Sequence, residues 1–197
     1  MKKDYLTAFK LIIGMTVLTG FLYPVTMTIT ARLIFPWKAG GSLIMSEGKI
    51  MGSALLGQKF DSTIYFWSRP SSSDYGTVPS GASNLGPTSQ ALLAKMHERR
   101  ADFVAKNYLT DSLSVPPDML FASGSGVDPH ISPASALLQV RRISEARHLD
   151  EKEREELNDL INELTEPPQF GILGESRINV LRLNMELDKL YKASNVQ

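Results

Sequence analysis

A long uncharged stretch near the N-terminus constrains the fold of this chain more than any other feature. Leu11 to Ala31 contains no charged residue and is rich in Leu, Ile, Val, Met, Phe and Thr. As an α-helix, its 21 residues would span roughly 31 Å at about 1.5 Å each, which matches a bilayer hydrocarbon core about 30 Å thick. We therefore predict a basic tail over residues 1–10 and a transmembrane anchor over residues 11–36, kinked near Pro24.

Two other interpretations of this stretch are weaker. A cleaved signal peptide would have an apolar core of about 7 to 15 residues and a small-residue cleavage site. The stretch here is longer, and no Ala-x-Ala site follows it. A buried helix of such uniformly apolar character would require a larger core than the remaining residues, roughly 160 in number, can supply. The sequence thus favours an uncleaved single-pass anchor.

The charges on the two sides of the anchor favour a cytoplasmic N-terminus only slightly. The nearest basic residues are Lys2, Lys3 and Lys10 before it and Arg32, Lys38 and Lys49 after it. A short basic tail usually remains in the cytoplasm, and a long following domain is translocated largely regardless of its charge. We therefore expect residues 37–197 to form one domain outside the cytoplasm.

Beyond the anchor, the pattern mixes short strands with amphipathic helices. Two apolar runs over residues 42–56 surround a Gly-containing turn and predict a β-hairpin, in which Gly52 and Gly57 indicate a bulge or a close backbone approach. Apolar residues recur at helical spacing from Ser89 to Tyr108, with Thr88 as the expected N-cap.

The C-terminal half predicts further helices and one strand. Ser132-Pro133 is typical of a helix start, and after a break near His148 a capping box of Asp150 and Glu153 begins the next helix. Ile178 to Leu183 predicts a buried strand, followed by a short helix from Asn184. Because strands and helices are mixed without repeated β-α-β alternation, the expected class is α+β, a single transmembrane helix followed by one mixed soluble domain.

Composition excludes several classes of function. Lys plus Arg equals Asp plus Glu at 21 each, so the chain has no basic field to attract nucleic acid. Cysteine is absent, which removes disulfides, thiolate nucleophiles and thiolate metal sites. His97 has no histidine at helical ligand spacing, so we interpret it as a solvated side chain and predict no metal site.

Motifs for phosphate chemistry are absent from the sequence. There is no Gly-x4-Gly-Lys-Ser/Thr loop and no Asp-Lys-Thr-Gly run for aspartyl phosphorylation, so we predict no catalytic site in this chain. The most distinctive loop contains Ser123, Gly124, Ser125, Gly126, Asp128 and His130. It lacks the Gly-x-Ser-x-Gly of a nucleophile elbow, which argues against a serine hydrolase. A tight glycine turn that satisfies local amides is the simpler interpretation, with one or both glycines at positive φ.

Six segments in chain order resemble one family, that of the C subunit of the bacterial potassium-transporting Kdp P-type ATPase. They are Gly41–Ile44, Gly52–Gln58, Tyr65–Ser71, Ser83–Thr88, Ala122–Pro133 with Gln139 and Arg142, and Asn179–Asn184 with Leu187 and Asp188. The resemblance covers nearly the whole chain, including the N-terminal anchor. Any one segment would be a weak signal, and the six together are a strong one.

The resemblance implies an accessory, non-catalytic subunit of a potassium uptake complex in the cell inner membrane. Its partners would be a channel-like potassium subunit, a P-type ATPase subunit and a small single-helix subunit. The family is described as a catalytic chaperone that raises ATP affinity, with the residue corresponding to Gln139 contacting nucleotide and the loop of residues 123–130 beside it. An extracytoplasmic domain would meet essentially no ATP, so we expect no firmly bound cofactor, with ATP acting through the complex. A membrane-tethered binding module unrelated to transport is the alternative.

Overall fold

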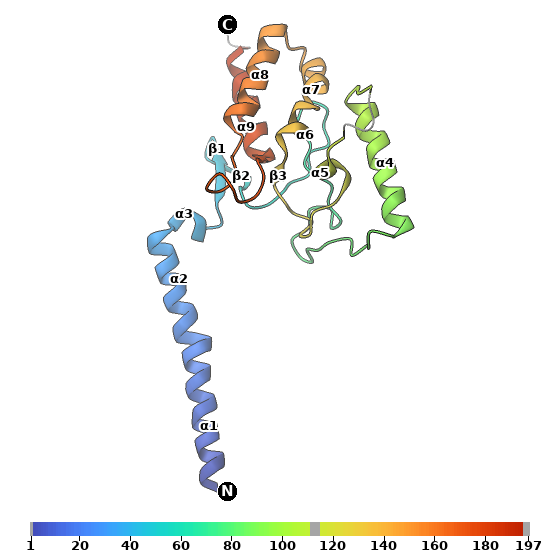
Figure 1. Ribbon diagram of the computed structural model, residues 1–197. Helices are drawn as coiled ribbons and strands as arrows, with labels where there is room; N and C mark the ends of the chain where they lie inside the picture. The colour runs from blue at the N-terminus through green and yellow to red at the C-terminus, as the bar shows by residue number, and fades with distance from the viewer. Residues whose placement is uncertain (1, 111–114, 195–197) are drawn as a thin grey trace. The chain divides into compact units, whose positions relative to one another are not determined.

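The computed structural model describes residues 2–110 and 115–194, and the chain divides into two compact units, residues up to Ser53 and residues from Ala54 on. The first unit begins with one long helical segment, built from α1 (Lys2–Val17), the π-helical turn η1 (Leu18–Leu22) and α2 (Tyr23–Ile34) (Figure 1). From Lys3 to Ile34 it is 32 residues long and apolar enough to cross a membrane, which agrees with the predicted anchor.

The expected disturbance at Pro24 takes the form of the π-helical turn η1. Proline has no backbone N–H, and its ring collides with the carbonyl four residues earlier, here that of Gly20. The wider turn before Pro24 relieves this collision by lengthening the helix ladder locally. The helical segment thus continues through the proline to Ile34.

The hydroxyls of four threonines in this helical segment donate hydrogen bonds to the helix backbone itself. Thr19, Thr26, Thr28 and Thr30 each donate a hydrogen bond to the carbonyl four residues before, at 2.7 to 2.8 Å. An unsatisfied hydroxyl in hydrocarbon is costly, so this back-bonding makes threonine compatible with a membrane environment.

After α3 (Pro36–Ala39), the first unit ends in an antiparallel hairpin of β1 (Leu43–Ser46) and β2 (Lys49–Ser53). Glu47 and Gly48 both have positive φ, the geometry that a two-residue hairpin turn requires. Ile44 pairs with Gly52 whereas Met45 pairs with Ile50, so Met51 is the extra residue of a bulge. The predicted hairpin and its irregularity at Gly52 are confirmed.

The second unit is mainly helical and belongs to the α+β class, as predicted (Figure 1). Its elements are α4 (Gln90–Lys106), α5 (Pro117–Leu120), β3 (His130–Ile131), α6 (Pro133–Leu137), α7 (Val140–Arg147), α8 (Glu151–Glu163), β4 (Ile178–Asn179) and α9 (Val180–Ser194). Helix α8 packs against α6, α7 and α9, and β3 pairs with β4 in antiparallel orientation. The core between them includes the fully buried side chains of Phe66, Ile143, Leu157, Ile161 and Leu183.

Side-chain caps set several of the helix starts in the second unit. Ser132 accepts a hydrogen bond from the backbone N–H of Ser135 and begins α6, as predicted. Asp150 and Glu153 form the predicted capping box of α8, with N–H to oxygen distances of 2.8 and 2.9 Å. His148 adopts the left-handed conformation, with φ of 57°, and ends α7 where the break was expected.

Two predicted boundaries are wrong. The N-cap of α4 is Ser89, whose hydroxyl accepts from the N–H of Leu92, rather than Thr88. The strand predicted from Ile178 to Leu183 ends at Asn179, because the Asn179 side chain accepts from the Arg182 N–H and caps a helix. Val180, Leu183 and Leu187 are buried at helical spacing, so α9 begins four residues before the predicted start at Asn184.

Candidate functional site

Gln139, the residue for which the family resemblance implies a nucleotide contact, lies between α6 and α7 and is completely buried. Its Oε1 accepts from the backbone N–H of Trp67 at 2.7 Å and from Arg142 Nη2 at 2.8 Å. Its Nε2 donates to the carbonyls of Ser135, at 3.2 Å, and Trp67, at 3.4 Å. A side-chain amide has two donor hydrogens and two acceptor lone pairs. All four are used, so a ligand would have to displace one of these bonds to contact Gln139.

Arg142 lies beside Gln139 and is only 2% exposed. Its Nε donates to Asn107 Oδ1 at 3.0 Å. Its terminal nitrogens donate to the carbonyls of Ser62, Thr63 and Tyr65. These three residues belong to the irregular segment, which we define as residues 54–89, between β2 and α4, where there is no helix or strand. The guanidinium carbon lies 3.7 Å from the centre of the Trp67 ring, a cation–π contact. In the described part of the chain, the hydrogen bonds of this cation all end on neutral oxygens.

Burial lowers the pKa of Arg142 to about 10, so the side chain still carries its charge at neutral pH. When no carboxylate faces a buried cation, its lost hydration is replaced only by hydrogen bonds to neutral oxygens. Such a cation is tolerated only when most of its N–H donors have acceptors. The arrangement therefore fixes the backbone around residues 62–67, which contains no helix or strand. We use the name Arg142 cage for Arg142 together with the groups that accept its hydrogen bonds, which are the side chains of Asn107 and Gln139 and the carbonyls of Ser62, Thr63 and Tyr65.

Two further side chains, Arg147 on α7 and Asn184 on α9, bind the same segment. Arg147 Nε donates to the Ile64 carbonyl and its Nη2 to Asp188, both at 2.7 Å. Asn184 pairs with the N–H and the carbonyl of Phe66 at 2.8 and 3.0 Å, as a neighbouring strand would. Side chains thus replace the backbone ladder that this stretch lacks.

Asn107 and Arg147 also belong to this network, and neither was expected from the sequence. A signal for Arg147 exists, because it follows the core residue Ile143 by four positions and so lies on the buried face of α7. A charged residue at core spacing indicates a buried polar network. For Asn107, at the end of α4, the sequence offers no comparable signal.

The loop from Ser123 to His130 packs against another part of the irregular segment. Ser71 Oγ donates to the Gly126 carbonyl at 2.6 Å, and the Gly57 N–H donates to the Val127 carbonyl at 2.7 Å. A Cβ on Gly57 would lie 2.6 Å from the Asp128 carbonyl oxygen, so the close approach expected at Gly57 is confirmed.

The two loop glycines differ in what they require. Gly126 has a φ of +73°, whereas Gly124 lies outside the left-handed region and has open space where a Cβ would be. We expect Gly126→Ala to lower the free energy of unfolding by about 1–3 kcal/mol, because the Cβ would strain φ and lie 2.9 Å from the Gly81 carbonyl. The matched control, Gly124→Ala, is expected to change it by less than about 0.5 kcal/mol. Urea unfolding of the two variants compares them, and equal losses would contradict the assignment.

Asp128 is the charged centre of this loop. Arg69 Nη1 donates to its Oδ2 at 2.8 Å, and the backbone N–H and ring of His130 lie 3.0 and 3.3 Å from its Oδ1. Partial burial opposes ionisation, but the hydrogen bonds from His130 and the contact with Arg69 outweigh it and lower the Asp128 pKa to about 2. The carboxylate is therefore ionised under all physiological conditions and links the loop to the irregular segment.

A cleft of about 680 Å³ opens beside this loop. Its lining residues are Arg69, Pro116, Pro117, Asp118, Phe121, Asp128, His130, Ile131, Ser132, Glu175, Ser176 and Arg177. The cleft brings together Asp128 and His130 from the predicted set, whereas Gln139 and Ser123 are buried elsewhere. Asp118 accepts a hydrogen bond from the Ser132 N–H at 2.7 Å, and this bond stabilises the start of α6.

The cleft lacks the arrangement of a serine hydrolase. Within the described residues, His130 hydrogen-bonds to Asp128 and its ring meets no serine hydroxyl. Ser132 Oγ is instead directed at Asp118 and Ser135, at 3.2 and 2.9 Å. A serine nucleophile of this class requires a histidine base within hydrogen-bonding reach, and the Ser132 hydroxyl has none, because its hydrogen bonds go to Asp118 and Ser135.

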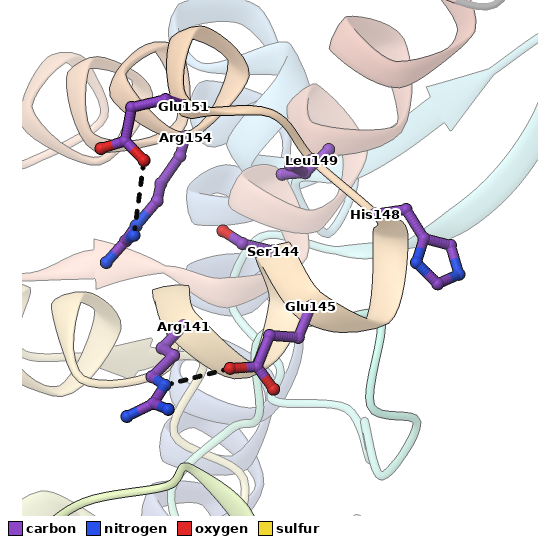
Figure 2. A pocket seen from close by; sticks show the side chains of 7 residues that line it. All are labelled: Arg141, Ser144, Glu145, His148, Leu149, Glu151 and Arg154. Atoms are coloured by element: carbon purple, nitrogen blue, oxygen red, sulfur yellow. Dashed lines mark hydrogen bonds and ion pairs between the residues drawn. The ribbon is translucent and has the colours of Figure 1, made fainter.

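A second cleft, of about 720 Å³, lies at the turn between α7 and α8 (Figure 2). Its lining residues are Arg141, Ser144, Glu145, His148, Leu149, Glu151 and Arg154. Each arginine forms an ion pair with a glutamate, Arg141 with Glu145 at 3.0 Å and Arg154 with Glu151 at 3.8 Å. Since these charges cancel, the cleft favours neither an anion nor a cation. The buried Ser144 hydroxyl has no hydrogen-bond partner among the described residues.

Among the described residues, neither cleft brings together the ligands of a metal site. Across residues 2–110 and 115–194, no group of three or more His, Asp or Glu side chains is placed to hold a metal ion. The described part of the chain therefore contains two polar clefts and a buried network around Gln139 and Arg142, in which every hydrogen-bonding position of Gln139 is occupied.

Comparison with known proteins supplies the identity that these clefts do not. The family model described as "K+-transporting ATPase, c chain" matches residues 5–189. A potassium-transporting ATPase KdpC subunit of Cereibacter sphaeroides is 47% identical over 177 residues, covering 90% of this chain and 92% of that protein. The KdpC subunit of Leptospira interrogans is 45% identical over 182 residues, covering 92% of each chain.

The similarity extends to both ends of a relative. The KdpC subunit of Methylococcus capsulatus is 43% identical over 193 residues, covering 96% of this chain and the full length of that protein. The matched region includes the apolar helical segment, the Arg142 cage and the loop of Asp128. The resemblance noted in six segments of the sequence is thereby confirmed, and the chain belongs to the family of the c chain of K+-transporting ATPases.

Proposed function

We propose that this chain is an accessory subunit of an ATP-driven potassium uptake complex, which it stabilises without catalysing a reaction itself. The observation that carries the proposal is the family match over residues 5–189. The sequence lacks both the Gly-x4-Gly-Lys-Ser/Thr loop and the Asp-Lys-Thr-Gly run, so ATP hydrolysis is assigned to another subunit. The partners are a channel-like potassium subunit, a P-type ATPase subunit and a small single-helix subunit.

The proposed topology places the N-terminus in the cytoplasm and the unit from Ala54 on outside it, in the cell inner membrane. The helical segment from Lys3 to Ile34 supports one crossing of the bilayer. Long domains that follow a short basic tail are translocated largely regardless of charge, and the chain has a net charge of zero. In this topology the second unit meets potassium before it enters the complex.

The proposed action on ATP affinity is indirect. Gln139 is completely buried and all of its hydrogen-bonding positions are occupied by Trp67, Arg142 and Ser135. The chain therefore raises the ATP affinity of the hydrolytic subunit by binding more tightly to the state that holds nucleotide. Such coupling requires only that both sites bias one conformational equilibrium.

The test compares assembled complexes with and without this chain. Omitting it is expected to raise the ATP concentration for half-maximal hydrolysis at least about fivefold. Gln139→Ala is expected to reduce the yield of assembled complex, because losing buried hydrogen bonds costs about 1–3 kcal/mol. Once assembled, however, that variant keeps the wild-type ATP dependence. Steady-state hydrolysis measured against ATP concentration gives both quantities.

Gln90→Ala is the matched control, since Gln90 is exposed on the first turn of α4. It should affect neither yield nor ATP dependence. Titration calorimetry of ATP into the purified full-length chain completes the test. Micromolar binding that disappears in Gln139→Ala would overturn the indirect mechanism, and an unchanged ATP dependence without the chain would overturn the effect on ATP affinity.

A further inference from the structure

An apolar arm projects from the second unit between α8 and β4. We define it as residues 167–174, whose sequence Pro-Pro-Gln-Phe-Gly-Ile-Leu-Gly contains no charged side chain. Phe170 is 90% exposed, Ile172 is 82% exposed and Leu173 is 57% exposed. Single exposed apolar residues are common, but three large ones at one tip are a feature of binding surfaces.

The arm is ordered by its own backbone. At its base, Glu166 and Arg177 exchange two backbone hydrogen bonds, at 2.8 and 3.0 Å, and their side chains form an ion pair at 3.1 Å. Closer to the tip, the Gln169 N–H donates to the Leu173 carbonyl at 2.9 Å. Phe170 has a φ of 55°, which turns the chain at the tip. A preformed loop of this kind loses little conformational entropy when it binds.

The base of the arm lies beside the point where the chain enters the second unit. Asn179, two residues after Arg177, donates from its side chain to the Ala54 carbonyl at 2.8 Å. Ala54 directly follows the unit that carries the membrane-spanning helical segment. The base of the arm is therefore fixed to the first residue of the second unit.

We propose that this arm inserts Phe170 and Ile172 into an uncharged apolar pocket on a membrane-embedded subunit of the same complex. This inference rests on the proposed function as an accessory subunit. Three side chains make a small contact compared with a stable protein interface. Tethering by the anchor raises the local concentration of the arm, so a small contact suffices.

The charges around the arm argue against a lipid surface as its binding partner. Loops that bind anionic headgroups place Lys or Arg beside their apolar tip. Here the flanking charges are Glu166, Glu175 and Arg177, and Arg177 is already paired with Glu166. An exposed aromatic and a branched aliphatic side chain on a rigid turn are instead typical of anchors that fill a protein pocket.

Cross-linking tests the contact directly, because the chain contains no cysteine. A benzophenone maleimide is attached to full-length Ile172→Cys, which is then added to the complex lacking this chain and irradiated. The matched control is Val78→Cys, at a residue that is 92% exposed in the irregular segment. We expect an adduct with another subunit from position 172 and none from position 78. Adducts with lipid only, with a second copy of this chain, or with nothing would overturn the proposal.

A second measurement separates this inference from the proposed function. Phe170→Ser, Ile172→Ser and Leu173→Ser combined are expected to lower the recovery of tagged chain in the complex about tenfold, since hot-spot residues dominate such contacts. Val78→Ser should keep the wild-type recovery, and the thermal unfolding of both variants should match the wild type. If the wild-type chain itself recovers no other subunit, the proposed function fails. If the triple variant is recovered like the wild type, the arm proposal alone fails.

Discussion

Replacing Arg142 with methionine is expected to lower the free energy of unfolding of the second unit by about 3–5 kcal/mol. Methionine fills much of the space but donates no hydrogen bond, so the buried Asn107 Oδ1 and the carbonyls of Thr63 and Tyr65 lose a donor. Each buried acceptor left unpaired costs about 1–3 kcal/mol, and local relaxation recovers part of the total. Urea unfolding followed by circular dichroism measures the loss.

Arg141→Met is the matched control, because the neighbouring arginine has a 57% exposed side chain and pairs with Glu145 on the surface. Its expected cost is below about 1 kcal/mol. Arg142→Lys is expected to rescue little, since one ammonium group cannot span the acceptors that a planar guanidinium reaches. Equal destabilisation by the two methionine variants would show that the Arg142 cage does not hold the irregular segment.

Deleting residues 1–36 is expected to abolish assembly while leaving a folded soluble domain. The buried core runs from Phe66 to Leu187 and lies entirely in the second unit, so it does not depend on the anchor. Losing the tether removes an effective-concentration advantage of about 10²–10⁴. Co-purification with tagged partner subunits should therefore fall below detection.

The truncated domain should also unfold in one cooperative transition on heating. Replacing the deleted segment with an unrelated transmembrane helix is the matched control, and it should restore part of the assembly if tethering is the main effect. Irreversible aggregation without a cooperative transition would show that the domain boundary near Trp37 is wrong. Undiminished co-purification of the truncated chain would show that the anchor is dispensable.

Much of the local structure was predictable because its signals lie within a few residues of each other. The starts of α6 and α8 follow from Ser132-Pro133 and from the capping box of Asp150, which act over one helical turn. The start of α9 was missed for a related reason. Val180 to Leu183 is apolar except for Arg182, and a short apolar run fits a buried strand as well as a buried helix. The Asn179 cap decides between them.

The site was less predictable, since its contacts join distant parts of the chain. Arg142 meets Asn107 across 35 positions and Tyr65 across 77. Neither periodicity nor motif spacing reports such pairings. The resemblance named Gln139 and Arg142 in one of its segments, but only the structure shows that they bind each other and the backbone of residues 62–67.

The side-chain ladder around residues 62–67 has a consequence for how this protein is made. Asn184 reaches back 118 positions to Phe66, and Asp188 reaches back 123 positions to Tyr65. Contacts of such long range form slowly, because the chain between them must first be ordered. During synthesis the segment near residue 66 leaves the ribosome long before α9 does. The second unit therefore remains incomplete until α9 has been synthesised, and it closes only when this helix binds Tyr65 and Phe66.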